Sequence, residues 1–145
     1  MSTLEKAIAL AVNVHQGQTD RAGAPYILHP LRVMFRLQGD VEQIVGVLHD
    51  VVEDSETTFD DLRRMGFSEA VITALDAVTR RDDETYEVFV ERSAAQPLAR
   101  RVKLADLADN MDVRRLAGDL SAQDLARLNR YRRAWNRLAG EESPR

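Results

Sequence analysis

Four ionisable side chains lie within six consecutive residues in the segment 49–54, HDVVED. Apolar residues precede this segment, so the charges fall on the last turns of a predicted helix. The helix dipole disfavours negative charge at a helix C-terminus, and like charges one turn apart, such as Asp50 and Asp54, repel each other. The cluster gains stability only if a cation offsets it. The segment therefore predicts a metal site beside His49, with a solvated helix end as the alternative.

Two other segments contain residues that would complete a metal site. His29 lies in the apolar stretch YILHP, and Asp106 lies in VKLADLADNM, within a helix that is predicted to be buried. Each residue alone could be a satisfied core group, but a buried aspartate without a partner is costly. The chain has no cysteine, so its ligands must be histidines and carboxylates. A mixed nitrogen and oxygen site suits Mn²⁺, Fe²⁺ or Zn²⁺.

Helices must position these residues, because the hydrophobic periodicity is helical throughout the chain. No segment has the period-two alternation of a strand, and no linker or repeat divides the sequence. We therefore expect a single all-α domain over residues 1–145. The pattern predicts about eight helices, near residues 3–15, 25–39, 40–54, 58–66, 68–79, 85–95, 97–118 and 121–139.

Capping residues mark the starts of two of these helices. Thr58 is followed by Asp61, and Ser121 is followed by Asp124. A hydroxyl at the first position and a carboxylate three residues later can satisfy two backbone N–H groups at a helix start. The fourth and the last predicted helix therefore begin at these residues.

The composition excludes several classes of protein. The chain is 44% hydrophobic and 30% charged, which is typical of a folded domain and not of a disordered one. It has no run of 18 apolar residues and no leader pattern, so we expect a cytoplasmic protein with no membrane partner. Its net charge of −4 and its 6% aromatic content argue against a nucleic-acid partner.

Charge is unevenly distributed along the chain. Residues 39–96 carry 15 acidic and 5 basic side chains, whereas residues 97–139 carry 10 basic and 5 acidic ones. One interpretation is a pair of complementary solvated helix faces, since most surface charges have no specific role. The other is an acidic metal centre that faces basic groups, which would hold an anionic substrate.

The order and spacing of His29, His49-Asp50 and Asp106 resemble those of HD-domain phosphohydrolases. The flanking segments GAPYILHP, LHDVVEDSETTFDDL, AVTR and VKLADLADNM are similar to the hydrolase domain of the RelA/SpoT enzymes and to the small alarmone hydrolases. The resemblance runs from about residue 5 to residue 118, and the predicted helix 121–139 follows it. It implies a single HD-domain helical bundle.

The resemblance also implies a reaction, in which pyrophosphate is removed from the 3′ position of guanosine tetra- or pentaphosphate, the alarmones of the stringent response. A bound ion lowers the pKa of water and neutralises phosphate charge. Glu53 is implied to orient or deprotonate that water, and Asp54 to assist or to protonate the leaving oxygen. Four residues are implied to bind one divalent ion, usually Mn²⁺: His29, His49, Asp50 and Asp106.

The resemblance places Arg21, Lys103 and Asn110 near the nucleotide, although Lys103 could instead support a metal ligand. Leu107 and Asp112 stand at two positions where the family has basic residues. These departures leave other substrates open, namely an adenosine alarmone or the 2′-phosphate of NADPH. A non-catalytic module that senses a nucleotide is a further alternative.

Two features outside the motifs have more than one interpretation. His15 either touches the substrate pocket or is a surface histidine at the end of a helix. The last helix is rich in arginine, and it carries an apolar stripe that packs either on the domain or on a second subunit, which leaves a homodimer open. The stripe consists of Tyr131, Ala134, Trp135 and Leu138.

Overall fold

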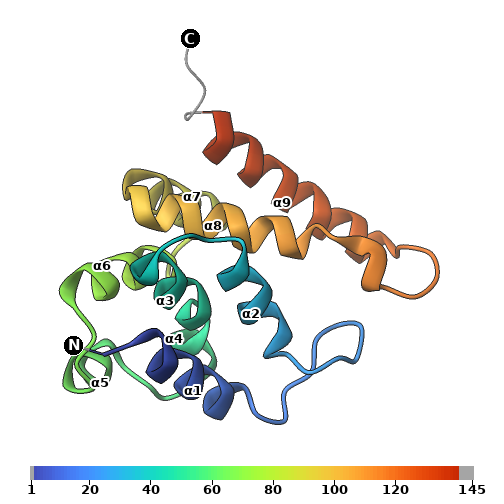
Figure 1. Cartoon of the computed structure of the whole chain (residues 1–145). Helices are drawn as coiled ribbons and strands as arrows, with labels where there is room; N and C mark the ends of the chain where they lie inside the picture. The colour runs from blue at the N-terminus through green and yellow to red at the C-terminus, as the bar shows by residue number, and fades with distance from the viewer. Residues whose placement is uncertain (1, 141–145) are drawn as a thin grey trace.

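The computed structural model describes residues 2–140, so residues 1 and 141–145 of the predicted domain lie outside the described part. The described residues form nine α-helices and a short 3₁₀ helix, with no strand apart from an isolated bridge between Thr19 and Pro25. The all-α class is confirmed (Figure 1). The elements are α1 (Leu4–His15), α2 (Leu28–Phe35), α3 (Asp40–Leu48), α4 (Val51–Asp54), α5 (Phe59–Arg64), α6 (Glu69–Ala77), α7 (Tyr86–Ala95), α8 (Pro97–Asn110), η1 (Val113–Arg115) and α9 (Ala122–Gly140).

The helix that the sequence predicts over residues 40–54 is broken in two at His49 and Asp50. Helix α3 ends at Leu48, and α4 is a single turn that begins at Val51. In a regular helix, successive side chains point in different directions. The break lets the two side chains meet, since His49 Nε2 lies 3.1 Å from Asp50 Oδ2. The prediction of one continuous helix was therefore wrong at the residues that matter most to the site.

The loop between α1 and α2 is longer than the sequence predicts, because α2 begins at Leu28 and not at Pro25. The backbone of residues 18–26 folds on itself through the Thr19–Pro25 bridge. The Asp20 carboxylate accepts backbone N–H groups of Ala22 and Ala24, both at 2.9 Å. This loop contains Arg21, and its end places the Tyr26 hydroxyl beside Asp50.

The main core surrounds α3, which packs against α1, α2, α6 and α8. Five consecutive α3 residues, from Ile44 to Leu48, are buried, as expected of a central helix. Gly46 faces α2 and the segment that follows it, because a Cβ there would lie 3.5 Å from Met34 Cα and 2.6 Å from Leu37 Cδ1. The close packing of α2, α3 and α8 brings the three segments with predicted ligands together.

Helix α9 is the outermost layer and lies against α7 and α8 (Figure 1). Its Ala134 and Leu138 are buried in a second apolar cluster, against which Tyr131 and Trp135 pack. The interpretation that the stripe packs on the domain is thus confirmed. No helix among residues 2–140 is long and apolar enough to cross a membrane.

Candidate metal centre

Three side chains meet where α2 passes the break between α3 and α4. His29, His49 and Asp50 each offer one donor atom, and these atoms all lie within 4.8 Å of one another. His29 Nε2 is 3.9 Å from Asp50 Oδ2, and both histidines are buried. A set of this kind, two imidazoles and a carboxylate, is able to hold a divalent cation.

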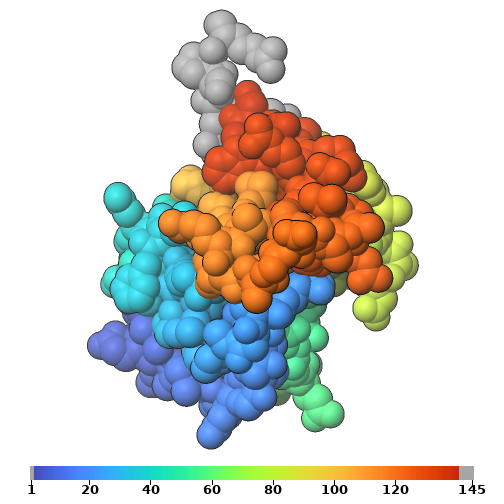
Figure 2. Space-filling model, turned by 90° about the vertical axis from the view of Figure 1, so that its right-hand side faces the viewer, coloured from blue at the N-terminus to red at the C-terminus, as the bar shows by residue number. Residues whose placement is uncertain are grey.

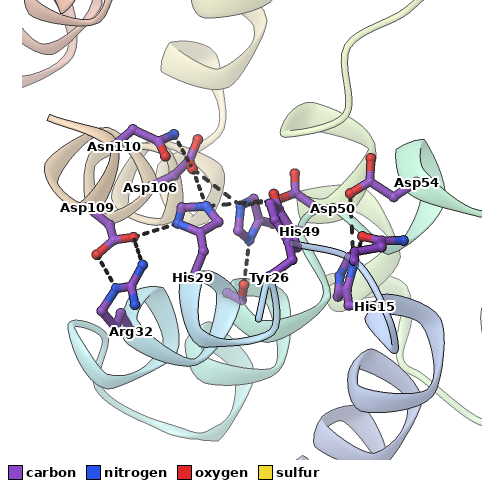
Figure 3. Close-up of polar contacts among 12 residues, drawn as sticks. His15, Tyr26, His29, Arg32, His49, Asp50, Asp54, Asp106, Asp109 and Asn110 are labelled. Carbon is purple, nitrogen blue, oxygen red and sulfur yellow. Dashed lines mark hydrogen bonds and ion pairs between the residues drawn. The ribbon is translucent and has the colours of Figure 1, made fainter. Parts of the chain in front are cut away.

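Asp106 reaches the same point from α8. Its Oδ1 lies 3.0 Å from His29 Nε2 and 3.3 Å from His49 Nε2 (Figure 3). The structure thus brings together all four residues that the sequence predicts as ligands. Their role as ligands remains a prediction.

His49 supplies the observation that tests whether a metal fits. Its Nδ1 lies 2.7 Å from the carbonyl oxygen of Gly46, so Nδ1 carries the proton of this hydrogen bond. Its Nε2 is buried, has no hydrogen-bond partner and faces oxygens of Asp50 and Asp106. A buried lone pair beside two carboxylates is costly unless a cation lies between them. The donor set therefore fits a metal ion.

The electrostatics of the centre agree with a need for positive charge. Burial alone would lower the pKa of His49, but the charges of Asp50 and Asp106 outweigh it and raise this pKa well above its ordinary value. Burial likewise opposes the ionisation of Asp50, yet His49 lowers the pKa of Asp50. The carboxylates thus remain charged and attract either protons or a metal to this point.

Lys103 contacts the second oxygen of Asp106, not the oxygen that lies near the two histidines. Its Nζ donates to Asp106 Oδ2 at 3.0 Å and lies 4.9 Å from the centre of the Phe89 ring. Burial would lower the pKa of Lys103, but the Asp106 charge raises it. The position matches the second of the two roles considered for Lys103, which is to support a metal ligand.

Sequence reasoning missed Asp109, which is 0% exposed and lies one turn beyond Asp106 on α8. Its Oδ2 is 2.6 Å from His29 Nδ1, and its two oxygens accept Arg32 Nε and Nη2 at 2.7 and 3.1 Å. Burial opposes ionisation, but these bonds lower the pKa of Asp109 to about 2. The signal was present, because Asp109 lies in the same apolar helix that made Asp106 a candidate.

Tyr26 is a second residue that sequence reasoning missed. Its hydroxyl donates a short hydrogen bond to Asp50 Oδ2. Burial and the nearby charge of Asp50 raise the pKa of Tyr26, so the phenol stays protonated and acts as a donor. Only the fold of the loop before α2 reveals this contact, because 24 residues separate the partners.

Glu53 and Asp54 lie on α4, directly after the dyad. Glu53 Oε1 accepts the backbone N–H of Arg80 at 2.8 Å, which anchors the carboxylate to the end of the AVTR segment. Burial raises the pKa of Glu53. Burial and then the charge of Asp50 raise the pKa of Asp54. The raised pKa values mean that both carboxyl groups take up a proton more readily than an ordinary carboxyl group, which suits residues that transfer protons.

His15 is buried, with 1% of its surface exposed, so its interpretation as a surface histidine was wrong. Its Nδ1 lies 3.0 Å from Gln18 Oε1 and 3.9 Å from Asp54 Oδ2. Its ring is 5.0 Å from that of Tyr26. His15 therefore packs beside Asp54 at one end of the centre, while Arg32 lies at the other end (Figure 3).

A cavity of about 360 Å³ opens beside His29 and Tyr26. It lies between the loop after α1 and the segments after α8, which meet on the face shown in Figure 2. Arg21 and Asn110, both predicted to contact substrate, line this cavity, whereas Lys103 does not. Sequence reasoning missed three further basic residues that line it: Arg32, Arg115 and Arg127.

Leu107 and Asp112 stand where the family has basic residues. In this chain, basic residues from other positions line the cavity instead. Arg115 follows α8 and Arg127 lies on α9, within the arginine-rich part of the sequence. Their position agrees with the second interpretation of the charge asymmetry, in which an acidic centre faces basic groups. The uneven charge distribution was the one feature of the sequence that could have indicated Arg115 and Arg127 as cavity residues.

No protein-family model matches the chain. Individual proteins do match it, and the fold with its His-Asp centre defines an HD-type domain. The chain is 36% identical over 121 residues to a GTP pyrophosphokinase of Streptomyces coelicolor. It is 31% identical over 120 residues to a guanosine-3′,5′-bis(diphosphate) 3′-pyrophosphohydrolase of Aquifex aeolicus. It is 30% identical over 139 residues to the bifunctional (p)ppGpp synthase/hydrolase SpoT of Escherichia coli.

These alignments cover 74%, 74% and 88% of this chain but only 14%, 17% and 20% of the relatives, so the chain spans at most a fifth of their length. A solved structure of a metazoan ortholog of SpoT, described as hydrolysing ppGpp, has the same fold, with a TM-score of 0.77 at 21% identity. That match covers 93% of this chain and 84% of the other. The chain is thus an HD-type domain related to the RelA/SpoT proteins, as its motifs predict.

Proposed function

We propose that this chain is a metal-dependent phosphohydrolase that removes the 3′-pyrophosphate of guanosine tetra- or pentaphosphate. One observation carries the proposal. The buried, unpartnered Nε2 of His49 meets His29, Asp50 and Asp106 close to an arginine-lined cavity. The relatives named as 3′-pyrophosphohydrolases support the same reaction.

The four converging residues would hold a divalent ion, since a mixed set of imidazole and carboxylate donors suits Mn²⁺, Fe²⁺ or Zn²⁺. We propose Mn²⁺ among these, because the resemblance to HD-domain phosphohydrolases implies it. When bound, a divalent ion supplies charge neutralisation at a phosphate oxygen and lowers the pKa of water. Lys103 bonds to one oxygen of Asp106 and keeps the other oxygen oriented toward that position. The chain's own side chains do the remaining work.

Glu53 is the proposed base, because burial raises its pKa above the ordinary value and a carboxylate of higher pKa takes up a proton more readily. Glu53 takes a proton from water as the water oxygen bonds to the phosphorus next to the 3′ oxygen. The bond between that phosphorus and the 3′ oxygen breaks, and Asp54 delivers the proton that the 3′ oxygen needs. The products are pyrophosphate and the nucleoside 5′-diphosphate or triphosphate.

The cavity residues are proposed to hold the nucleotide. Arginine recognises phosphate oxygens through paired N–H groups, and the cavity offers Arg21, Arg32, Arg115 and Arg127. Asn110 lines the same cavity while donating to Asp106 Oδ1 at 3.0 Å. Substrate and ion would thus be held side by side.

We propose further that residues 1–145 form one HD domain and that it acts in the cytoplasm on a free nucleotide. The basic cavity supports a free nucleotide as the substrate, because it is lined by side chains suited to phosphate.

The test is turnover of a nucleotide panel by metal-stripped protein to which Mn²⁺ is returned. The panel contains guanosine tetra- and pentaphosphate, their adenosine counterparts and NADPH. We expect pyrophosphate only from the guanosine compounds, no turnover by Asp106→Asn, and normal turnover by Asp119→Asn, an exposed acid outside the site. Turnover of another member would reassign the substrate, and tight binding without turnover would favour a sensing module.

A further inference from the structure

One imidazole is held between two carboxylates of the same helix. Asp106 Oδ1 lies 3.0 Å from His29 Nε2, and Asp109 Oδ2 lies 2.6 Å from His29 Nδ1. Because the two aspartates are three residues apart on α8, they lie one above the other on one face of the helix. His29 is therefore fixed from both ring nitrogens, and only its Nε2 faces His49 and Asp50.

Asp109 is a charged group that the proposed reaction does not use directly. It is fully buried, and a buried carboxylate persists only with strong partners. Arg32 supplies them as a two-pronged pair, with Nε 2.7 Å from Oδ1 and Nη2 3.1 Å from Oδ2. Arg115 adds a bond from Nη2 to the backbone oxygen of Asp109 at 2.9 Å.

The arrangement links two pairs of residues on crossing helices. His29 and Arg32 are three residues apart on α2, and Asp106 and Asp109 are three apart on α8. Each member of one pair contacts a member of the other (Figure 3). The contact therefore fixes how α2 lies across α8 at the metal centre.

From this geometry we propose that Asp109 is a positioning residue, which holds His29 in the tautomer and orientation needed to bind a metal through Nε2. A carboxylate only accepts, so the bond to Asp109 keeps a proton on Nδ1 of His29. Nε2 is then the nitrogen that would lose its proton and offer its lone pair to a metal ion. A histidine ligand gains basicity and a fixed ring orientation from such a partner. The inference rests on the metal centre of the proposed function.

Asp109 also connects the metal centre to the substrate cavity. Arg32 and Arg115 both line the cavity, and both bond to Asp109. When Asp109 is replaced, His29 loses its second anchor and the two arginines lose their shared acceptor. Metal affinity should therefore fall first, and cavity contacts should loosen with it.

The test compares the Mn²⁺ dissociation constants of full-length wild type, Asp109→Ala, Asp109→Asn and Asp112→Asn. Loss of such a partner weakens metal binding by roughly 10- to 100-fold, and we expect a change in this range for Asp109→Ala and a smaller one for Asp109→Asn. Asp112 is the matched control, because it bonds to Arg114 and Arg115 but not to His29. Asp112→Asn should change the dissociation constant less than about threefold, because ion pairs near the surface contribute little energy.

A second readout separates positioning from a merely structural role. In the Zn²⁺-loaded protein, proton and nitrogen NMR should show the Nδ1–H of His29 as a slowly exchanging, downfield signal in wild type and in Asp112→Asn. The signal should be lost in Asp109→Ala while circular dichroism remains that of a folded protein. If Asp109→Ala does not fold, Asp109→Asn decides through its Mn²⁺ affinity.

Two results would overturn the inference. One is folded Asp109 variants that bind Mn²⁺ as tightly as wild type, and the other is an Asp112→Asn variant that loses as much affinity as they do. Wild type that binds no divalent ion would overturn both this inference and the proposed function. Wild type that binds Mn²⁺ but hydrolyses no nucleotide would refute the proposed function alone, since the affinities still test Asp109.

Discussion

Lys103 Nζ lies 3.0 Å from Asp106 Oδ2, and both side chains are buried. The other Asp106 oxygen, Oδ1, faces the two histidines of the centre. One carboxylate thus divides its two oxygens between a fixed cation of the protein and the proposed metal position. Lys103 therefore neutralises part of the negative charge of the centre when no ion is bound.

Replacing Lys103 by methionine should destabilise the metal-free protein strongly. Removing one partner of a buried ion pair costs about 3 to 5 kcal/mol, because the other charge is left uncompensated. Urea unfolding in chelator should show this loss, and Mn²⁺ should restore part of it. Lys6→Met, at an exposed position, should change the free energy of unfolding by less than about 0.5 kcal/mol. An equal loss of unfolding free energy in both variants would show that the Lys103–Asp106 ion pair makes no specific contribution to stability.

Glu53→Gln should keep its metal and lose its rate. The glutamine oxygen is still able to accept the Arg80 N–H, so the local structure is preserved. Loss of a general base lowers kcat by roughly 10²- to 10⁴-fold. Steady-state kinetics and Mn²⁺ binding measure the two effects separately, with the exposed Glu56→Gln as the control. A Glu53→Gln protein with full rate would remove Glu53 from the water-handling role.

The stability of the metal-free protein should fall as pH rises above about 6.5. The neighbouring carboxylates outweigh burial and raise the pKa of His29 and of His49 above the ordinary value of 6.5. The stability that comes from these raised values is therefore complete below pH 6.5 and is lost as pH rises through the folded-state pKa. Ligation needs unprotonated histidines, so stabilisation by Mn²⁺ should grow over the same range.

Melting temperatures with chelator and with Mn²⁺, compared at about pH 6 and about pH 8, measure both trends. The shift caused by Mn²⁺ should be larger at the higher pH. Equal shifts at the two values would show that proton release from these histidines is not coupled to metal binding.

Tyr26→Phe should destabilise the protein, whereas Tyr86→Phe should not. The Tyr26 hydroxyl donates to Asp50, and a hydrogen bond to a charged group contributes about 1.5 to 3 kcal/mol. The Tyr86 hydroxyl is buried with no hydrogen-bond partner, so its removal should be neutral or stabilising. Thermal unfolding of the two variants compares these effects directly. Equal destabilisation would mean that the Tyr26 bond to Asp50 contributes nothing beyond packing.

Local patterns in the sequence determined most of the helices and their starts. Thr58 and Asp61 form the predicted capping box, with backbone bonds at 3.1 and 2.9 Å. Ser121 and Asp124 make the equivalent pair of bonds before α9, both at 3.0 Å. These features depend on residues three or four apart, so they are visible without any knowledge of the fold.

The order of the motifs likewise predicted that four residues lie together, and the structure brings them together: His29, His49, Asp50 and Asp106. The break that aims His49 and Asp50 at one point was not predicted, because the apolar periodicity continues through it. Tertiary packing overrides helix propensity there, where the centre requires two successive side chains to meet.

Only the tertiary structure decided which groups surround the set. Tyr26 reaches Asp50 across 24 residues, and Asp109 reaches His29 across 80. The sequence alone assigned no role to Asp109, yet its carboxylate contacts His29 and Arg32, and its backbone oxygen accepts a hydrogen bond from Arg115. Residue type and spacing determine what a side chain is able to do, but the packing of α2 against α8 determines its partner, because contacts at this sequence separation have no local pattern.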